Sequence, residues 1–535
     1  MNIFVDIVIS FYLLALLFLS SCTQTNLTGG TSTSENGRIM GTVVNETGET
    51  AQNVRVELLP SSYNPLFENI SIYVDSTDEN GAFCFDSLLP GSYTINSIDI
   101  SGNRGALCYN IISSHDTSIL ASDTLRRFGT MLCSFTDSSS DTARYAYIPG
   151  TTLAAKIHNG VALISHVPSG ILPLIRCISE TLQDSDYVIA SNALIRAGDT
   201  TVIPDITSFK YSREIQLNTS TNGAAITETI TDFAVLIRLT RENFSFDQAQ
   251  PDGSDLLFTK KDQTLLRFEI ERWDTQLQQA ELWVNVDTIH GNNATQSIIM
   301  HWGGPSIPVS SRNTPVFDTS AGYTATWHLN SNSLDASVNG YNSISCSAID
   351  TIGIIGGCKK FDGNDSIVIP SLLDTQKTVT LSAWARLDSS NAGSDVISIG
   401  DAILLRMDFL KDSLGTIGSI HINDGIYYSN IMSKQFLAGS GWHLITFVFD
   451  NELKERTLLV DGSIVYKTTG ATTSINYTGV GKNTIIGKHG NGKTEFGFIG
   501  CIDEVRVFRK ALTPDYVKLC YISQINNNSF VHFVK

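Results

Sequence analysis

The chain has 535 residues, which is enough for about three to five domains of ordinary size. Hydrophobic residues make up 42% and charged residues 17% of the sequence, so there is apolar material for several cores and general disorder is excluded. The formal net charge is -17 and no run of Lys and Arg occurs, which excludes nucleic acid as a partner.

Residues 1–21 are typical of a secretion signal. An apolar run of 13 residues, 7–19, is short for a membrane span and of the right length for a signal h-region, although no Lys or Arg precedes it. An uncleaved N-terminal membrane helix is the alternative interpretation. The sequence Leu-Ser-Ser-Cys that ends at Cys22 resembles the lipobox of bacterial lipoproteins. This resemblance implies that Cys22 carries a lipid anchor and that the protein is exported, to the cell surface or outer membrane.

Residues 22–37 are rich in Thr, Ser, Asn and Gly, as expected of a flexible tether. Beyond them, short Val-, Ile- and Thr-rich runs alternate between Asn, Asp and Gly turns and predict an all-β fold. The runs within residues 38–117, together with the Pro-Gly-Ser-Tyr sequence at 90–93, resemble the carboxypeptidase regulatory-like domain, a small prealbumin-like sandwich. Residues 118–205 repeat the pattern more weakly and predict a second, divergent small sandwich.

Nine cysteines occur, and eight remain when Cys22 is set aside. An even number is expected of disulfides in an exported protein. Pairing within each module gives Cys84 with Cys108, Cys133 with Cys177, Cys346 with Cys358, and Cys501 with Cys520. A zinc site of cysteines is the rival interpretation, but no two of them are spaced as zinc ligands usually are.

Residues 206–305 predict a third β-rich domain. Its runs include Val235–Leu239, Asp252–Thr259, Leu265–Trp273, Ala280–Val286 and Ser297–Gly303. In this order they resemble a bacterial domain of unknown function that precedes concanavalin A-like modules. Glu269 and Glu271 invite a general acid/base interpretation, but two residues apart on a strand they are expected on a solvated face or in a salt-linked pair.

Residues 316–525 carry the clearest functional signal. The motifs in chain order are Phe361-Asp-Gly, Ser382-Ala-Trp, Trp442-His, Val460-Asp-Gly and Ile502-Asp-Glu-Val-Arg. They resemble the laminin-G-like, concanavalin A-like lectin/glucanase fold, so the chain is expected to be a series of β-sandwiches that ends in a jelly roll. Asp461-Gly462 between two apolar runs predicts a hairpin turn, and Thr513-Pro514 predicts the start of a short helix.

Catalysis is not expected of this last domain. Glycosidases need two carboxylates on either side of the scissile bond, and Asp503 and Glu504 are neighbours that a regular strand places on opposite faces. Residues 487–494 fit the phosphate-loop pattern, but a strand is predicted after them, so the helix N-terminus that would hold a phosphate is missing. We therefore expect neither an enzyme nor a nucleotide partner.

The resulting hypothesis is a surface-anchored lipoprotein that binds polysaccharide or glycoprotein through its C-terminal domain. The side chains expected to contact the ligand are Tyr427, Tyr428, His489, Asn491 and Lys493. The resemblance also implies a possible structural Ca²⁺, held by Asp335 and Asp503, although a turn role for Asp335 is an equally good interpretation. A structural or adhesive spacer that binds other proteins is the alternative function, and a glycoside hydrolase is a further one.

Overall fold

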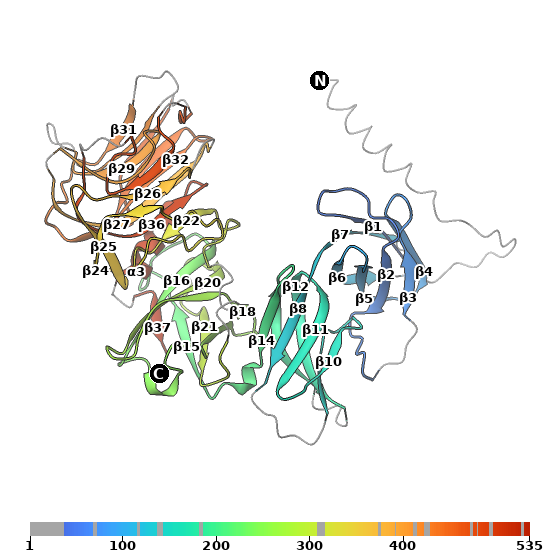
Figure 1. Ribbon diagram of the computed structural model, residues 1–535. Coiled ribbons are helices and arrows are strands. Elements are labelled where there is room, and N and C mark those ends of the chain that lie inside the picture. The colour runs from blue at the N-terminus through green and yellow to red at the C-terminus, as the bar shows by residue number, and fades with distance from the viewer. Residues whose placement is uncertain are drawn as a thin grey trace, which may run out of the picture. The chain divides into compact units, whose positions relative to one another are not determined.

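Strands make up almost all of the regular structure (Figure 1), which confirms the predicted all-β class. The computed structural model describes residues 37–534 with gaps at residues 68–71, 115–117, 136–142, 181–185, 308–315, 373–375, 391, 410–414, 422–427, 471–473, 479, 492–495 and 526–528. The predicted signal segment and Cys22 lie outside the described residues. Within the described part, no helix is long and apolar enough to cross a bilayer.

The chain divides into two compact units, Met1–Asp205 and Ile206–Lys535. In the first unit, one small sheet has the order β4-β1-β7 and packs with part of a larger sheet of order β11-β8-β6-β5-β2-β3, to which β14 adds beside β8. A four-stranded sheet of order β10-β9-β12-β13 completes the unit. The strands are β1 (Gly37–Val44), β2 (Arg55–Pro60), β3 (Tyr73–Ser76), β4 (Ala82–Leu88), β5 (Gly91–Asp99), β6 (Arg104–Ser113), β7 (Ser118–Thr124), β8 (Arg126–Ser134), β9 (Arg144–Tyr147), β10 (Ala154–Lys156), β11 (Val161–Pro168), β12 (Gly170–Ser179), β13 (Tyr187–Ile195) and β14 (Thr200–Pro204).

The two small sandwiches of this unit share a sheet. β6 and β8 pair where Arg104 lies opposite Arg127, so one sheet runs from the first sandwich into the second. β7 pairs in parallel with β1, although the expected boundary at residue 117 placed it in the second sandwich. Burial alternates strictly along β1, and its inward residues Ile39 and Val43 belong to the core of the first sandwich.

In the second unit, the middle module has two sheets, β18-β17-β21-β15-β37 and β16-β20-β19. Its strands are β15 (Tyr211–Leu217), β16 (Ile230–Thr240), β17 (Leu257–Lys260), β18 (Leu265–Leu266), β19 (Phe268–Asp274), β20 (Gln279–Ile289) and β21 (Ser297–Trp302), with 3-10 turns η2 (Ile206–Ser208) and η3 (Phe246–Gln248). The last strand of its first sheet, β37 (Val531–Phe533), comes from the C-terminal end of the chain and pairs with β15.

The C-terminal module is a sandwich of two sheets. One has the order β24-β25-β36-β27-β32-β33-β34, with β22 beside β36, and the other has the order β23-β26-β35-β28-β29-β30-β31. The strands are β22 (Tyr323–Trp327), β23 (Ser345–Cys346), β24 (Ile349–Ile352), β25 (Gly357–Asp362), β26 (Ile367–Pro370), β27 (Val379–Ser389), β28 (Ser394–Ile399), β29 (Ile403–Met407), β30 (Ile417–His421), β31 (Tyr428–Met432), β32 (Trp442–Asp450), β33 (Glu455–Val460), β34 (Ser463–Thr469), β35 (Asn483–Ile486) and β36 (Ile499–Phe508).

Two local predictions in this module are confirmed. Asp461 and Gly462 join β33 to β34 with φ of 52° and 73°, as a two-residue turn with both central residues left-handed requires. Helix α3 (Pro514–Gln524) begins at Thr513, whose side chain accepts a hydrogen bond from the Tyr516 backbone N–H.

No disulfide is present among the eight described cysteines, so the predicted pairings stay a prediction. Cys84 lies on β4 and Cys108 on β6, in different sheets. The Cys501 thiol on β36 contacts the Arg386 guanidinium, 3.1 Å away, whereas Cys520 lies on α3 in the apolar cluster that holds Trp384.

The middle and C-terminal modules share one hydrophobic core. Phe233, Trp283 and Trp302 of the middle module belong to the same buried cluster as Trp384 and Phe508 of the C-terminal module. Helix α3 lies between them, since the Tyr516 ring packs 5.3 Å from that of Phe233 and the Tyr516 hydroxyl lies 3.1 Å from the Tyr323 hydroxyl. The two modules therefore form one folding unit and are not independent domains joined by a linker.

The return of the chain to the middle module yields a stability prediction. Phe530, just before β37, is 1% exposed in the shared core. We expect Phe530→Ala to lower the free energy of unfolding of residues 206–535 by about 3–5 kcal/mol, because it leaves a cavity. Urea unfolding measures the loss. Val534→Ala, at a side chain 43% exposed, is the matched control and should change stability by less than about 0.5 kcal/mol. Equal effects of the two substitutions would contradict the role given to the C-terminal segment.

Candidate functional site

The residues expected to contact a ligand are only partly brought together. His489 is buried, with Nε2 3.3 Å from Asp401 Oδ1 and its ring beside that of Phe496. Asn491, two residues later, is exposed. Tyr428 begins β31, while Tyr427 and Lys493 lie outside the described residues.

A buried ion pair lies beneath the 488–491 loop. Arg406 on β29 pairs with Asp395 on β28, and the Phe496 ring covers its guanidinium at 3.5 Å. Burial raises the pKa of Asp395 although Arg406 opposes the shift. His489 lies 4.0 Å from the same carboxylate, so it helps to fix the loop rather than to present a free imidazole.

Asp335 and Asp503, the expected Ca²⁺ ligands, bind different backbone segments. The Asp335 carboxylate accepts hydrogen bonds from the backbone N–H groups of Thr326, Ser337 and Tyr341, at 2.8–2.9 Å, and so stabilises a turn. Asp503 accepts from Ile354 and Ile355 at 2.9 and 3.1 Å. The structure supports the turn interpretation of Asp335, and the Ca²⁺ site stays a prediction.

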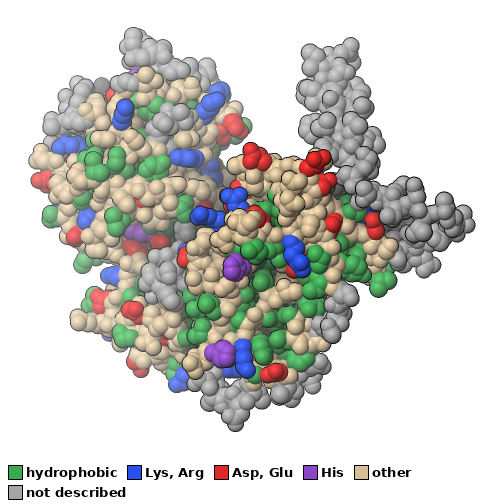
Figure 2. All heavy atoms as spheres, turned by 45° about the vertical axis from the view of Figure 1, so that its right-hand side comes forward, with side chains coloured by type: hydrophobic (Ala, Val, Ile, Leu, Met, Phe, Trp, Pro, Cys, Tyr) green, Lys and Arg blue, Asp and Glu red, His purple; other side chains and the backbone are tan. Residues whose placement is uncertain are grey.

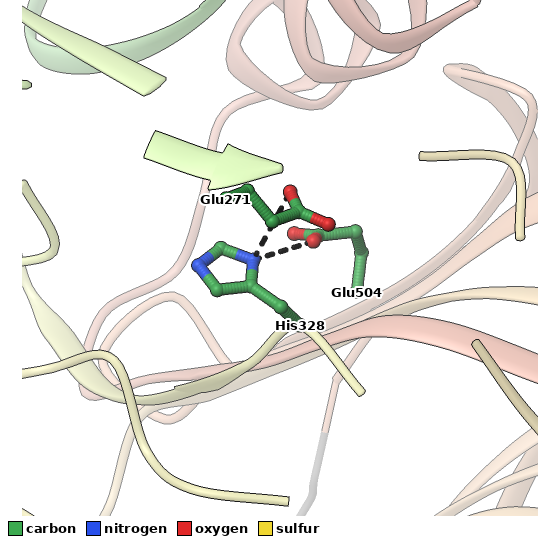
Figure 3. Close-up of side chains that lie close together, drawn as sticks. All are labelled: Glu271, His328 and Glu504. Atoms are coloured by element: carbon green, nitrogen blue, oxygen red, sulfur yellow. Dashed lines mark hydrogen bonds and ion pairs between the residues drawn. The ribbon is translucent and has the colours of Figure 1, made fainter. Parts of the chain in front are cut away.

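A densely charged site lies at the junction of the middle and C-terminal modules. Glu269 and Glu271 come from β19, His328 directly follows β22, and Glu504 and Arg506 come from β36. The His328 Nδ1 lies 2.5 Å from Glu504 Oε1 and 3.7 Å from Glu271 Oε2, and its Nε2 lies 2.7 Å from Glu269 Oε1. Figure 3 shows the Glu271 and Glu504 carboxylates turned toward the same edge of the imidazole. Three carboxylates therefore surround one imidazole, and we call these four residues and Arg506 the junction cluster.

Local structure explains how Glu504 enters this cluster. β27 pairs with β36 at Ser382–Arg506 and at Trp384–Asp503, so β36 carries one extra residue there. Glu504 takes a φ of 50°, a left-handed conformation rare for a residue other than glycine. The expectation that Asp503 and Glu504 lie on opposite faces of a regular strand is therefore wrong, because the bulge breaks the alternation.

Aromatic and guanidinium groups hold the junction cluster in place. The Trp283 indole stacks on His328 with ring centres 5.9 Å apart and planes 18° apart, and its Nε1–H donates to Glu271 Oε2 at 2.8 Å. Arg506 donates to Glu504 Oε2 at 2.6 Å, and its guanidinium carbon lies 4.4 Å from the centre of a Trp283 ring.

Burial and mutual charge shift the acid–base behaviour of this cluster. Burial would lower the pKa of His328, but Glu504 and Glu271 outweigh it and raise that pKa well above 6.5. Burial, and then the charge of Glu504, raises the pKa of Glu271. For Glu504, burial is outweighed by His328 and Arg506, so its pKa is lowered. Burial and the charges of Glu504 and Glu271 also raise the pKa of Asp503 well above its ordinary value.

Sequence reasoning missed this cluster. It placed Glu269 and Glu271 in a solvated or salt-linked pair, whereas the Glu271 side chain is 2% exposed and faces another module. One signal was present, because three charged residues, Asp503, Glu504 and Arg506, interrupt an otherwise apolar strand. Charged side chains in a buried strand require partners, and no partner can be named from β36 alone.

Two family models match the chain. Residues 361–518 match the concanavalin A-like lectin/glucanases superfamily, and residues 252–330 match a domain of unknown function, DUF2341. The chain therefore contains both domains, as the two resemblances in its second unit predicted. The DUF2341 match includes Glu269, Glu271 and His328, whereas Glu504 lies in the other match, so the junction cluster draws on both families.

The similar solved structures include the binding domain of Paraclostridial Mosquitocidal Protein 1, with 17% identity and a TM-score of 0.31 over 37% of this chain and 52% of that chain. This chain thus spans about half the length of that protein. Domain 4 of AbnA, a GH43 extracellular arabinanase from Geobacillus stearothermophilus in complex with arabinotriose, matches with 17% identity and a TM-score of 0.31 over 37% of this chain and 96% of its own. The Ruminococcus gnavus IT-sialidase CBM40 bound to alpha2,3 sialyllactose matches with 18% identity and a TM-score of 0.25 over 28% of this chain and 84% of its own. No curated protein matches the sequence significantly. At TM-scores this low, the likenesses say nothing of what this chain binds.

The first unit has a groove of its own, about 260 Å³ in volume, between its two small sandwiches. Asp123 on β7 and Arg126 on β8 line one part of it, and Ser169 and Ile171 line another. The Asp123 carboxylate is buried and accepts a hydrogen bond from the Ser97 hydroxyl at 2.9 Å. Burial raises its pKa from 3.8 to about 6.

This shift predicts a pH-dependent stability of the first unit. Because the folded-state pKa of Asp123 lies above the unfolded value, its contribution is fully present below about pH 4 and is lost as pH rises through about 6. We expect Asp123→Asn to stabilise the unit by about 2–3 kcal/mol at pH 8 and by little at pH 4. Urea unfolding at the two pH values measures the difference. Glu46→Gln, at an exposed carboxylate of the same unit, is the control, and a gain from Asp123→Asn that did not vary with pH would contradict this assignment.

Proposed function

We propose that this chain is a non-catalytic lipoprotein, anchored in a membrane through Cys22, that binds polysaccharide or glycoprotein through its C-terminal module. The observation that carries the proposal is the match of residues 361–518 to a lectin/glucanase superfamily, on a sandwich with the two sheets of that fold. Loops that join the strands at its edges are the usual place for ligand contacts.

The placement of the carboxylates supports binding rather than hydrolysis. Glu271 and Glu504 are the acidic pair facing one another at the junction, and their side chains are 2% and 1% exposed. A retaining or inverting glycosidase needs two carboxylates that reach the scissile bond from either side. A pair sealed between two modules cannot reach a polysaccharide.

The proposed ligand contacts are Tyr427, Tyr428 and Asn491. The buried contacts of Arg406 and His489 hold the loop that carries Asn491, which lowers the entropy lost when a ligand binds. Aromatic side chains such as Tyr427 and Tyr428 bind sugars through stacking and a hydroxyl. Figure 2 shows both acidic and basic side chains on the face that it draws, and the net charge of -17 argues against a nucleic acid as the ligand.

Retention on insoluble polysaccharides and on a glycan array tests this proposal with residues 206–535, because residues 316–525 lack part of the shared core. We expect specific retention without released reducing sugar. Replacing Tyr427 and Tyr428 with Ala should weaken binding by about tenfold, equivalent to about 1.4 kcal/mol. Tyr466→Ala, at a tyrosine 44% exposed on the other sheet, should leave binding unchanged.

Two other experimental results would contradict this proposal, and each would favour a different function. Binding to proteins without retention on any glycan would favour an adhesive spacer. Apolar side chains exposed on the first unit, namely Ile112, Leu163, Ile171 and Leu194, are consistent with that alternative. Release of reducing sugar would favour a glycoside hydrolase.

The anchor has its own test. We expect the native chain to incorporate labelled palmitate and to sediment with membranes, because a diacylated cysteine stably anchors a protein. Cys22→Ser should remove the label and leave the chain with an uncleaved N-terminus, which mass spectrometry of the N-terminal peptide detects. Ser21→Ala, a small-for-small change beside the cysteine, is the control. An unmodified Cys22 in the native protein would refute the anchor.

A further inference from the structure

Three side chains of the junction cluster present donor atoms to one point. One atom each of Glu271, His328 and Glu504 lies within 4.8 Å of the others. Two of these residues belong to the C-terminal module and one to the middle module. We propose that this point binds one divalent transition-metal ion, best Zn²⁺, which joins the two modules.

His328 and Glu504 are each oriented by an outer partner and keep a second atom for the centre. His328 uses Nε2 toward Glu269, which leaves Nδ1 facing the carboxylates. Glu504 uses Oε2 toward Arg506 and turns Oε1 to Nδ1. Metal-binding histidines and carboxylates are commonly fixed through a hydrogen bond from their other atom in this way.

Glu271 supplies the second, independent observation. Its Oε2 accepts from Trp283, but its Oε1 makes no hydrogen bond within the described part of the chain, although the side chain is 2% exposed. A buried carboxylate oxygen without a hydrogen bond is destabilising, because nothing compensates for its removal from water. A bound cation would satisfy it.

The hydrogen bonds of His328 determine which of its ring nitrogens can face an ion. When Nε2 carries the proton that binds Glu269, the neutral ring presents a lone pair at Nδ1. The 2.5 Å between Nδ1 and Glu504 Oε1 fits a shared proton, which a bound cation would displace as the two atoms move apart. A cation serves Glu271 at the same time, whereas a single proton on Nδ1 leaves Glu271 Oε1 without a partner.

The junction contains more acidic than basic side chains, which favours the binding of a cation. Five carboxylates interact there, those of Glu269, Glu271, Glu281, Asp503 and Glu504. Three guanidinium groups, of Arg238, Arg272 and Arg506, oppose them. When all of these groups are ionised, the carboxylates outnumber the guanidinium groups by two, and a divalent cation would offset that excess.

The donor set selects the class of ion. One imidazole nitrogen and two carboxylate oxygens suit Zn²⁺, which takes three or four protein ligands in a tetrahedral arrangement. Ca²⁺ prefers six to eight oxygen donors and Mg²⁺ an octahedral shell with several waters, and neither fits a site of one imidazole and two carboxylates. Burial of the ligands, at 14%, 2% and 1% exposure, indicates a structural ion rather than a catalytic one.

Calorimetric titration of the full chain with Zn²⁺ tests the proposal. The protein carries no tag, is kept in detergent, and is freed of metal with a chelator before the titration. We expect Zn²⁺ to bind at this site with one equivalent that disappears in His328→Gln and in Glu271→Gln. The difference between wild type and His328→Gln separates binding at this site from binding at the cysteine thiols. Co²⁺ should give visible d–d absorption in the wild type, whereas Ca²⁺ and Mg²⁺ should bind without a change on substitution of His328.

Glu269→Gln distinguishes weaker metal binding from a failure to fold. Glu269 orients His328 but is not itself a ligand, so its replacement should leave the fold intact. We expect it to weaken Zn²⁺ binding by about 10–100-fold with an unchanged near-ultraviolet circular dichroism spectrum. Glu214→Gln, at a partly exposed carboxylate of the middle module, should bind as the wild type does. The proposal is overturned if the wild type and His328→Gln take up the same number of equivalents, since the cluster would then be held by protons alone.

Discussion

The burial of apolar surface between the middle and C-terminal modules is the interaction on which the second unit depends. Trp283 and Phe233 on one side and Trp384 and Phe508 on the other belong to one continuous core. Neither module can bury these large side chains alone, since each supplies part of the cover for the other. The chain reinforces this arrangement by returning through α3 to add β37 to the middle module. Two family matches that are separate in sequence therefore describe one folding unit.

The shared core also explains why so many charges lie inside it. Removing Glu271, His328 and Glu504 from water is costly, and the cost is offset only when partners from both modules meet in one geometry. Apolar packing tolerates small rotations of one module against the other, whereas bonds of 2.5–2.8 Å do not. The junction cluster thus specifies the angle at which the modules dock, and it does so with carboxylates that are sealed away from any glycan.

Periodicity in the sequence was sufficient for the elements but not for their assembly. The strands, the Asp461-Gly462 hairpin and the helix after Thr513 follow from local patterns, and the structure contains them. The sheet shared by β6 and β8 and the return of β37 depend on contacts between distant segments, which no local pattern encodes. The bulge at Glu504 adds one residue to a strand whose sequence reads as regular, so the side on which its carboxylate lies could not be derived.

A rigid second unit bears on the proposed binding role. Affinity for a polysaccharide is limited by the entropy lost when loops become ordered, so a loop fixed beforehand binds more tightly for the same contacts. The Asp395–Arg406 pair, covered by Phe496 and flanked by His489, fixes the 488–491 loop on the sheet that β28 and β29 share. Burial of His489 therefore changes its expected role from touching the ligand to positioning Asn491. The two buried charge networks of this unit therefore have different roles. The junction cluster sets how the modules dock, and the Asp395–Arg406 pair sets the shape of the proposed binding edge.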